Sequence, residues 1–388
     1  MIVSTSALLD FFLKTRTHTE TICKPLQIED YVVQPIADVS PPKWHLGHTT
    51  WFFEDFILKK YKSDYKEFNK QFAFVFNSYY ESMGARVVRT DRGNLSRPTV
   101  GEVYAYRKYV TSALAKLLQE NDSLTELKEL IEIGIHHEKQ HQELLLTDIK
   151  YILGNNPLQP LYSENFNEYQ PISNTPKWLP VKEGVYKIGH NDSGFCYDNE
   201  LGRHNVFLSE YQISSELVTN AEYLKFIEDD GYNQVLLWHS EGWDWIEENN
   251  IFAPQYWQNQ DGEWYCYQLN GVQKLDLQAP VTHISYYEAF AFAQWKGLRL
   301  PTEFEWEIAQ SKFDWGQRWE WTESAYLPYP NYTKAPGALG EYNGKFMVSQ
   351  KTLRGGSVAT SDNHTRATYR NFFHPQLRWQ FTGLRLAR

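Results

Sequence analysis

The tryptophans of this 388-residue chain are distributed unevenly, and this constrains the folds that it can adopt. Two of the 14 precede residue 170, and the other 12 lie after residue 177. The composition therefore changes near the middle of the chain, where Asn155–Pro180 carries several prolines among polar residues. Because such stretches typically connect domains, the sequence predicts a first domain at 1–155, a connector at 156–177 and a second domain at 178–388.

The first half has the pattern of long helices. Apolar residues recur there at spacings of three and four, with few glycines or prolines inside the segments. The predicted helices cover residues 6–16, 49–61, 102–120 and 123–153. Four long helices favour a bundle.

The second half has a different periodicity. Short segments alternate between apolar and polar residues and are separated by Gly, Asn and Asp, as is typical of strands and loops. The predicted strands cover residues 184–190, 204–214, 279–285, 351–357 and 381–387, and two helical patches cover 220–230 and 285–297. This half is therefore expected to form an α+β domain.

Charge and composition exclude several classes of protein. The net charge of −10 argues against non-specific binding of nucleic acid, which depends on neutralising phosphates. No run of 18 apolar residues is present, so we expect no membrane span. The N-terminal stretch lacks the charged region of a signal peptide, and the three cysteines are too scattered for a disulfide framework. These features predict a cytoplasmic protein.

Histidines supply the first candidates for chemistry. His137 and His141, in the segment HEKQH, lie one helical turn apart on one face, whereas His136 points about 100° away. His45 and His48 lie three residues apart at the start of an earlier helix, and either one can supply a third ligand. A site of three histidines suits zinc or non-haem iron, and periodicity does not decide between these metals.

Two alternatives of other classes follow from the same residues. HEKQH also fits the HExxH signature of zinc metallopeptidases, in which the glutamate is the general base. Such a site needs another ligand, and Glu164 and Glu168 are available in the connector. A second alternative is a lectin-like binding module on a helical scaffold, which would hold no metal.

Several motifs, in their order along the chain, resemble the EgtB family, the iron-dependent sulfoxide synthases of ergothioneine biosynthesis. These motifs are WHLGH, HEKQH, RLPTEFEWE, WEWTES, LRGGS and RNFFHPQLRWQFTGLRLAR. The resemblance covers essentially the whole chain. It implies an α + (α+β) fold, with an N-terminal DinB-like four-helix bundle and a C-terminal formylglycine-generating-enzyme-like (C-type-lectin-like) domain.

The resemblance implies that His48, His137 and His141 bind Fe(II) and leave three coordination positions open. Members of the family use O2 to join a sulfur compound to C2 of the hercynine imidazole and oxidise the sulfur to a sulfoxide. The implied substrates are therefore hercynine, O2 and a thiol. A copper-dependent formylglycine-generating oxidase is disfavoured, because it needs a pair of cysteines near the C-terminus and none follows Cys266.

The resemblance also assigns roles in the segment FNSYYESMGARVVRTDRG. In cysteine-using members a tyrosine pair stands beside the metal, which here corresponds to Tyr79 and Tyr80, and one of the hydroxyls supplies a proton or an electron. Arg89 and Arg92 match the ligands of the cysteine carboxylate, and Arg86 is a supporting candidate. A guanidinium group binds a carboxylate bidentately, which suits this role.

The resemblance implies two further substrate contacts, Gln140 and Asn371, and both are expected to orient hercynine. Phe372 and Phe373 are candidates to face its trimethylammonium group, since aromatic faces attract quaternary cations. Members that use γ-glutamylcysteine have Asn-Trp-Asp where this chain has Asn371–Phe373, and the missing acid favours L-cysteine. Synthesis with γ-glutamylcysteine and an ovothiol-type reaction of histidine with cysteine are kept as alternatives. The sequence leaves open a structural Ca²⁺ in the second domain.

Overall fold

The computed structural model describes residues 4–78, 84–120, 125–171, 175–191, 194–334 and 342–388. The contacts within the chain divide it into two compact units. The first unit consists of Met1–Ser163, a short segment that ends at Phe195, and Thr360–His364. The rest of the chain forms the second unit, and the division after Ser163 falls inside the segment predicted as a connector.

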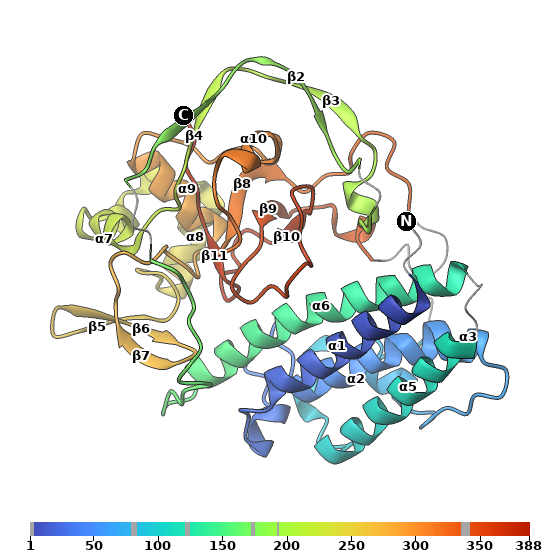
Figure 1. The fold of residues 1–388 in the computed structure, drawn as a ribbon. Coiled ribbons are helices and arrows are strands. Elements are labelled where there is room, and N and C mark those ends of the chain that lie inside the picture. The colour runs from blue at the N-terminus through green and yellow to red at the C-terminus, as the bar shows by residue number, and fades with distance from the viewer. Residues whose placement is uncertain (1–3, 79–83, 121–124, 172–174, 192–193, 335–341) are drawn as a thin grey trace. The chain divides into compact units, whose positions relative to one another are not determined.

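The first unit is a bundle of helices, as predicted (Figure 1). Its long helices are α1 (Thr5–Cys23), α2 (Pro42–Phe53), α5 (Val100–Glu120) and α6 (Thr125–Gly154). α1 packs against α6, and α2 packs against both α5 and α6. The shorter elements are η1 (Ile28–Val32), a π-helical turn η2 (Glu54–Leu58), α3 (Lys59–Tyr61), α4 (Phe72–Phe76) and η4 (Arg89–Asn94).

Two glycines allow neighbouring elements to approach α2 and α6 closely. A Cβ at Gly47 would lie 2.1 Å from a ring carbon of Phe76, so the glycine lets the end of α4 pack directly on α2. A Cβ at Gly134 would lie 2.5 Å from the ring of Phe53, at the contact of α6 with α2. Real Cβ atoms do not tolerate such distances, and these positions therefore fix the spacing of the helices.

The second unit mixes strands and helices, as predicted. Its largest sheet has the order β10–β9–β8–β11, in which β11 runs parallel to β8 and the other pairs are antiparallel. A three-stranded sheet and two ribbons, β1–β4 and β2–β3, complete the strands. The strands are β1 (Trp178–Val181), β2 (Gly184–Ile188), β3 (His204–Leu208), β4 (Tyr211–Ser214), β5 (Trp257–Gln260), β6 (Glu263–Gln268), β7 (Gly271–Lys274), β8 (Trp319–Ala325), β9 (Lys351–Gly355), β10 (Asn371–Phe373) and β11 (Thr382–Gly383).

The α-helices of this unit are α7 (Asn220–Glu228), α8 (Ser240–Asn249), α9 (Tyr286–Trp295) and α10 (Glu303–Ala309). Its short 3₁₀ turns are η5 (Asp198–Glu200), η6 (Gly231–Asn233), η7 (Val235–Leu237), η8 (Gln310–Lys312) and η10 (Gly344–Phe346). The motif tryptophans Trp306, Trp319 and Trp321 are buried in its core. Glu320 lies between two of them in sequence and accepts hydrogen bonds from Trp306 Nε1 and from the Arg385 guanidinium. The RLPTEFEWE and WEWTES motifs therefore have a structural role in this unit.

The predicted strand at 279–285 is wrong. Its backbone groups do not follow one partner strand, because Val281 N–H donates to Val218 O and His283 N–H donates to Thr382 O. His283 also has a φ of 59°, which interrupts an extended ladder. The alternating pattern there reflects burial between several elements and not strand pairing. No helix within the described ranges is long and apolar enough to cross a membrane.

Candidate metal centre

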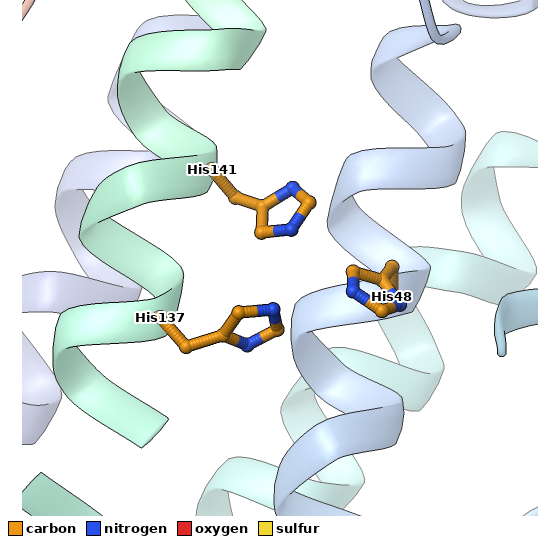
Figure 2. A group of neighbouring side chains, drawn as sticks. All are labelled: His48, His137 and His141. Atoms are coloured by element: carbon orange, nitrogen blue, oxygen red, sulfur yellow. The ribbon is translucent and has the colours of Figure 1, made fainter. Parts of the chain in front are cut away.

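Three histidines of the first unit converge between α2 and α6. His48 comes from α2, and His137 and His141 come from successive turns of α6 (Figure 2). One ring nitrogen of each lies within 4.8 Å of the others, and all three side chains are buried. Among the residues that the structure describes, no second cluster of three or more His, Cys, Asp or Glu could hold a metal ion. The structure therefore joins the two histidine motifs, and the described residues give no support for the structural Ca²⁺.

His48 is held in one orientation by its neighbours. Its ring stacks between Trp44, at 4.6 Å between ring centroids, and Trp51, at 5.5 Å. Its Nδ1–H donates to the carbonyl oxygen of Phe76 over 2.6 Å. The other nitrogen, Nε2, is buried without a hydrogen-bond partner among the described residues. Because Nδ1 carries the proton, Nε2 has the lone pair that a metal needs.

Burial keeps the three imidazoles neutral. Desolvation lowers the pKa of His137 to about 3. Desolvation, followed by the neighbouring His137, lowers the pKa of both His48 and His141 well below the ordinary value. Neutral imidazole is the form that binds metals, so the three side chains fit a divalent transition metal at neutral pH. Imidazole donors suit iron and zinc alike.

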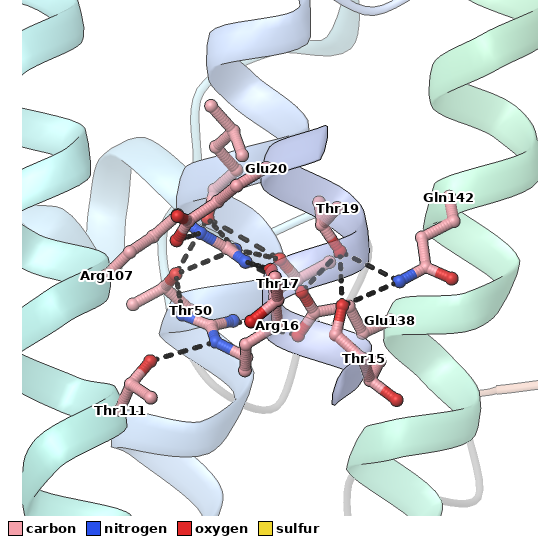
Figure 3. Close-up of polar contacts among 12 residues, drawn as sticks. Thr15, Arg16, Thr17, Thr19, Glu20, Thr50, Arg107, Thr111, Glu138 and Gln142 are labelled. Atoms are coloured by element: carbon pink, nitrogen blue, oxygen red, sulfur yellow. Dashed lines mark hydrogen bonds and ion pairs between the residues drawn. The ribbon is translucent and has the colours of Figure 1, made fainter. Parts of the chain in front are cut away.

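Glu138, the glutamate of HEKQH, takes part in a buried ion-pair cluster (Figure 3). Its Oε2 accepts from Arg16 Nη1 and its Oε1 accepts from Arg107 Nη2, each over 2.8 Å. Thr19 Oγ1–H also donates to Oε1 over 2.6 Å. A carboxylate committed to two guanidinium groups is unsuited to act as the general base of a peptidase. Glu168, one of the ligands considered for a peptidase, accepts from Leu269 N–H in the second unit.

The predicted arginines have different surroundings. Arg92 is buried, and its Cζ lies 3.4 Å from the ring centroid of Trp44, on which His48 stacks. Arg92 also donates to the hydroxyls of Ser40 and Ser78. Arg89 is half exposed and pairs with Asp38. The structure thus connects Arg92 to the histidine cluster and gives Arg89 a different partner.

Comparisons with known proteins match both units. The family model of the DinB superfamily matches residues 12–145, and that of the sulfatase-modifying factor enzyme 1-like domain matches residues 164–318. A hercynine oxygenase of Mycolicibacterium smegmatis is 29% identical over 351 residues, which cover 72% of this chain and 77% of the relative. A hercynine oxygenase of Mycobacterium tuberculosis is 29% identical over 329 residues, which cover 72% and 75%.

Both domain types occur in the expected order, and the similarity to the hercynine oxygenases extends over most of the chain. These matches are the ones expected of a chain of the EgtB type. A formylglycine-generating enzyme of Thermomonospora curvata is also similar, at 29% identity over 158 residues, but these cover 36% of this chain and 52% of that protein. This shorter match indicates that such enzymes share one of the two domains with this chain.

The other residues expected at an EgtB-type site fall in several places. Tyr79 and Tyr80 lie outside the described residues. Gln140 lies on α6 between His137 and His141 and is half-buried, and Arg86 is half-buried in the segment before η4. The three residues of β10, Asn371, Phe372 and Phe373, are half-buried in the second unit.

Two of these β10 side chains take part in aromatic packing. The ring of Phe372 stacks on Tyr326 with 4.2 Å between centroids. The ring of Phe373 lies edge-on to Trp379 at 5.8 Å. These contacts hold β10 against its own unit.

Sequence reasoning missed the residues around the three histidines. Trp44 and Trp51 stand four residues before and three residues after His48, so the helical spacing could have placed them on its two sides. Asp148 follows His141 by seven residues, which is two helical turns on the same face. His45, left open as a ligand, bridges His141 and Asp148.

Proposed function

We propose that this EgtB-type protein is a non-haem Fe(II) enzyme that uses O2 to join C2 of hercynine to the sulfur of L-cysteine and to form the sulfoxide. The observation that carries the proposal is the buried cluster of three neutral imidazoles, in which His48 directs an unpartnered Nε2 towards the other two. The similarity to proteins named hercynine oxygenase supports the choice of hercynine. An oxidoreductase that uses oxygen is the class of enzyme that these relatives indicate.

The atoms of the proposed reaction balance without a further reductant. The C2–H bond of hercynine and the S–H bond of cysteine are lost, and one C–S bond forms. One atom of O2 ends on sulfur, and the other leaves as water with the two hydrogens. Fe(II), when bound by three imidazoles, supplies open coordination positions and the redox chemistry that O2 requires.

In this proposal the residues of the chain bind and orient the substrates. Arg92 is the best-supported ligand for the cysteine carboxylate, because it is buried beside Trp44 and already donates to two neutral hydroxyls that an anion can replace. Arg89 is proposed for the same carboxylate, with Arg86 as a supporting residue. Gln140 and Asn371 orient hercynine, with Phe372 and Phe373 beside its trimethylammonium group. Tyr79 or Tyr80 supplies a proton or an electron for the reduction of O2.

The decisive experiment measures metal dependence and oxygen uptake together. The protein is stripped of metal, reconstituted anaerobically with Fe(II) or with Zn(II), and supplied with hercynine and cysteine. We expect O2 uptake with a sulfoxide product for the Fe(II) form and none for the Zn(II) form. Absence of uptake by a preparation with one bound Fe(II) would refute the proposal. Hydrolysis of peptides by the Zn(II) form would instead support the metallopeptidase.

The thiol donor needs a separate test. We expect a higher kcat/KM for cysteine than for γ-glutamylcysteine, because β10 lacks the acid found in the γ-glutamylcysteine users. Arg92→Ala should mainly raise the KM for cysteine, and Arg97→Ala, an exposed arginine nearby, is the matched control. A preference for γ-glutamylcysteine, or an unchanged cysteine KM in Arg92→Ala, would contradict this assignment.

A further inference from the structure

His141 belongs to a row of three buried side chains that extends away from the metal centre. His45 Nδ1 lies 2.9 Å from His141 Nδ1, and His45 Nε2 lies 3.0 Å from Asp148 Oδ2. The same carboxylate oxygen accepts from Ser40 N–H over 2.8 Å. His45 is 2% exposed, Asp148 2% and His141 7%. His45 comes from α2 and the other two from α6, so the row also joins the two helices that carry the cluster.

The hydrogen bonds among His141, His45 and Asp148 restrict which ring nitrogens of the two histidines carry protons. A carboxylate only accepts hydrogen bonds, so His45 Nε2 carries the proton that it donates to Asp148. If His45 is neutral, its second nitrogen is an acceptor, and His45 Nδ1 then accepts in the contact with His141. His141 Nδ1 therefore carries a proton. The lone pair of His141 is left on Nε2, the nitrogen on the other side of the ring.

The opposite placement of the proton would disable His141. If His45 Nδ1 were the donor, His141 Nδ1 would be the acceptor, and the proton of a neutral His141 would be on Nε2. Neither nitrogen would then offer a lone pair to a metal. His48 also has the Nδ1–H tautomer, because its Nδ1–H donates directly to the carbonyl of Phe76. The two ligands thus have equivalent tautomers set by different partners.

We propose that His45 and Asp148 are positioning residues that hold His141 in the Nδ1–H tautomer and fix its ring for metal binding. Histidines that bind metals usually donate from their second nitrogen to a carboxylate or a carbonyl group, and loss of such a partner typically weakens metal binding by about 10- to 100-fold. Here the carboxylate acts through an intervening imidazole. The inference rests on the proposed function only in that the three histidines bind a divalent metal.

The first test needs no variant. Long-range ¹H–¹⁵N correlation spectra of the full-length, metal-free protein labelled with ¹⁵N-histidine report the tautomer of each ring, and His141→Gln identifies the signal of His141. We expect the Nδ1–H tautomer for His141 and the Nε2–H tautomer for His45. The Nε2–H tautomer at His141 would overturn the proposal.

The second test measures the affinity for Co(II), whose visible spectrum reports the ligand set. We expect binding to weaken by about 10- to 100-fold in His45→Leu, which removes the acceptor, and also in Asp148→Asn, which removes the charge. His45→Asn keeps an acceptor near the position of Nδ1 and should recover most of the affinity. His136→Asn changes another buried histidine of α6, one that stacks on Phe195, and should bind Co(II) like the parent protein.

The outcomes separate the two proposals. Unchanged Co(II) affinity in both His45→Leu and Asp148→Asn would overturn the positioning role, as would equal losses in His45→Leu and His45→Asn. If His45→Leu fails to fold, Asp148→Asn and the tautomer measurement still decide. Lack of O2 uptake with hercynine and cysteine, together with the expected tautomers and affinities, would refute the proposed reaction and leave this inference intact.

Discussion

Arg107 donates from Nη2 to Oε1 of Glu138 over 2.8 Å, and solvent reaches neither side chain. Glu138 lies one residue after His137, so α6 presents a histidine to the three-histidine cluster and, from the adjacent position, a carboxylate to two arginines. A short motif that combines histidines and a glutamate thus serves two separate sites. This division distinguishes the chain from a zinc peptidase, in which the glutamate faces the metal.

Glu138→Gln should destabilise the protein strongly. The substitution keeps the shape of the side chain and removes the charge that balances Arg16 and Arg107, and breaking a buried pair in this way typically costs about 3–5 kcal/mol. Urea unfolding followed by circular dichroism measures the change in the free energy of unfolding. Glu129→Gln, on an exposed position of the same helix, is the control and should change it by less than about 0.5 kcal/mol. Equal effects of the two substitutions would show that the cluster does not stabilise the bundle.

Mild acid should destabilise the metal-free protein. In the folded state burial lowers the pKa of His48, His137 and His141, that of His137 to about 3, whereas in the unfolded chain they titrate near the ordinary value of about 6.5. The unfolded state therefore binds more protons below pH 6.5. The free energy of unfolding is therefore unaffected by these histidines above pH 6.5. It decreases as the pH falls below that value, by up to about 1.4 kcal/mol per pH unit for each histidine.

Unfolding experiments between pH 7.5 and pH 4.5 check this dependence. His137→Gln removes one titrating group, so its free energy of unfolding should fall less steeply with decreasing pH than that of the parent protein. A parent protein whose stability does not change between pH 6.5 and pH 4.5 would contradict the neutral, buried state of the cluster.

The fold was largely predictable because its signals are local. Apolar spacing in α1, α5 and α6 and the alternation in β2 and β3 follow from the residues of each segment alone. The predicted strand at 279–285 was wrong, because its apolar residues are buried by several elements and its hydrogen bonds go to Val218 and Thr382. Local alternation of apolar and polar residues does not distinguish a paired strand from an unpaired segment that several elements bury.

The candidate metal centre was predictable only in part. The i, i+4 spacing of His137 and His141 placed them on one face, but the choice between His45 and His48 depends on how α2 rotates against α6, which spacing alone does not give. The roles of Asp148 and of the Phe76 carbonyl depend on tertiary contacts. The same holds for Glu138, whose partners Arg16 and Arg107 come from α1 and α5.

Trp44 should contribute to metal binding through its packing. Its ring contacts both the Arg92 guanidinium and the His48 imidazole, so its removal takes a packing partner from each group. Trp44→Leu should lower the free energy of unfolding, by less than the about 3–5 kcal/mol typical of truncating a buried aromatic residue to alanine, and should weaken Co(II) binding. Trp44→Phe keeps an aromatic face, so its free energy of unfolding and its Co(II) affinity should both decrease less. Stronger Co(II) binding in Trp44→Leu than in Trp44→Phe would contradict a positioning role for the indole.

Gly47→Ala should damage the metal centre from a position that carries no functional group. The new Cβ would lie 2.1 Å from the buried ring of Phe76, so this ring must move, and we expect the end of α4 to move with it. That shift moves the Phe76 carbonyl, which accepts the Nδ1–H of His48. Overpacking of this kind typically costs about 1–3 kcal/mol, and the loss of the carbonyl contact should also weaken Co(II) binding.

Gly101→Ala is the matched control for this prediction. Gly101 lies in α5, and a Cβ there meets no atom within 4 Å, so alanine should stabilise the helix by about 0.5–1 kcal/mol. Its Co(II) affinity should equal that of the parent protein. If Gly47→Ala bound Co(II) as tightly as Gly101→Ala, the Phe76 carbonyl would not be needed to orient His48. A loss of Co(II) affinity confined to Gly47→Ala would show that close packing of α4 on α2 holds this ligand in place.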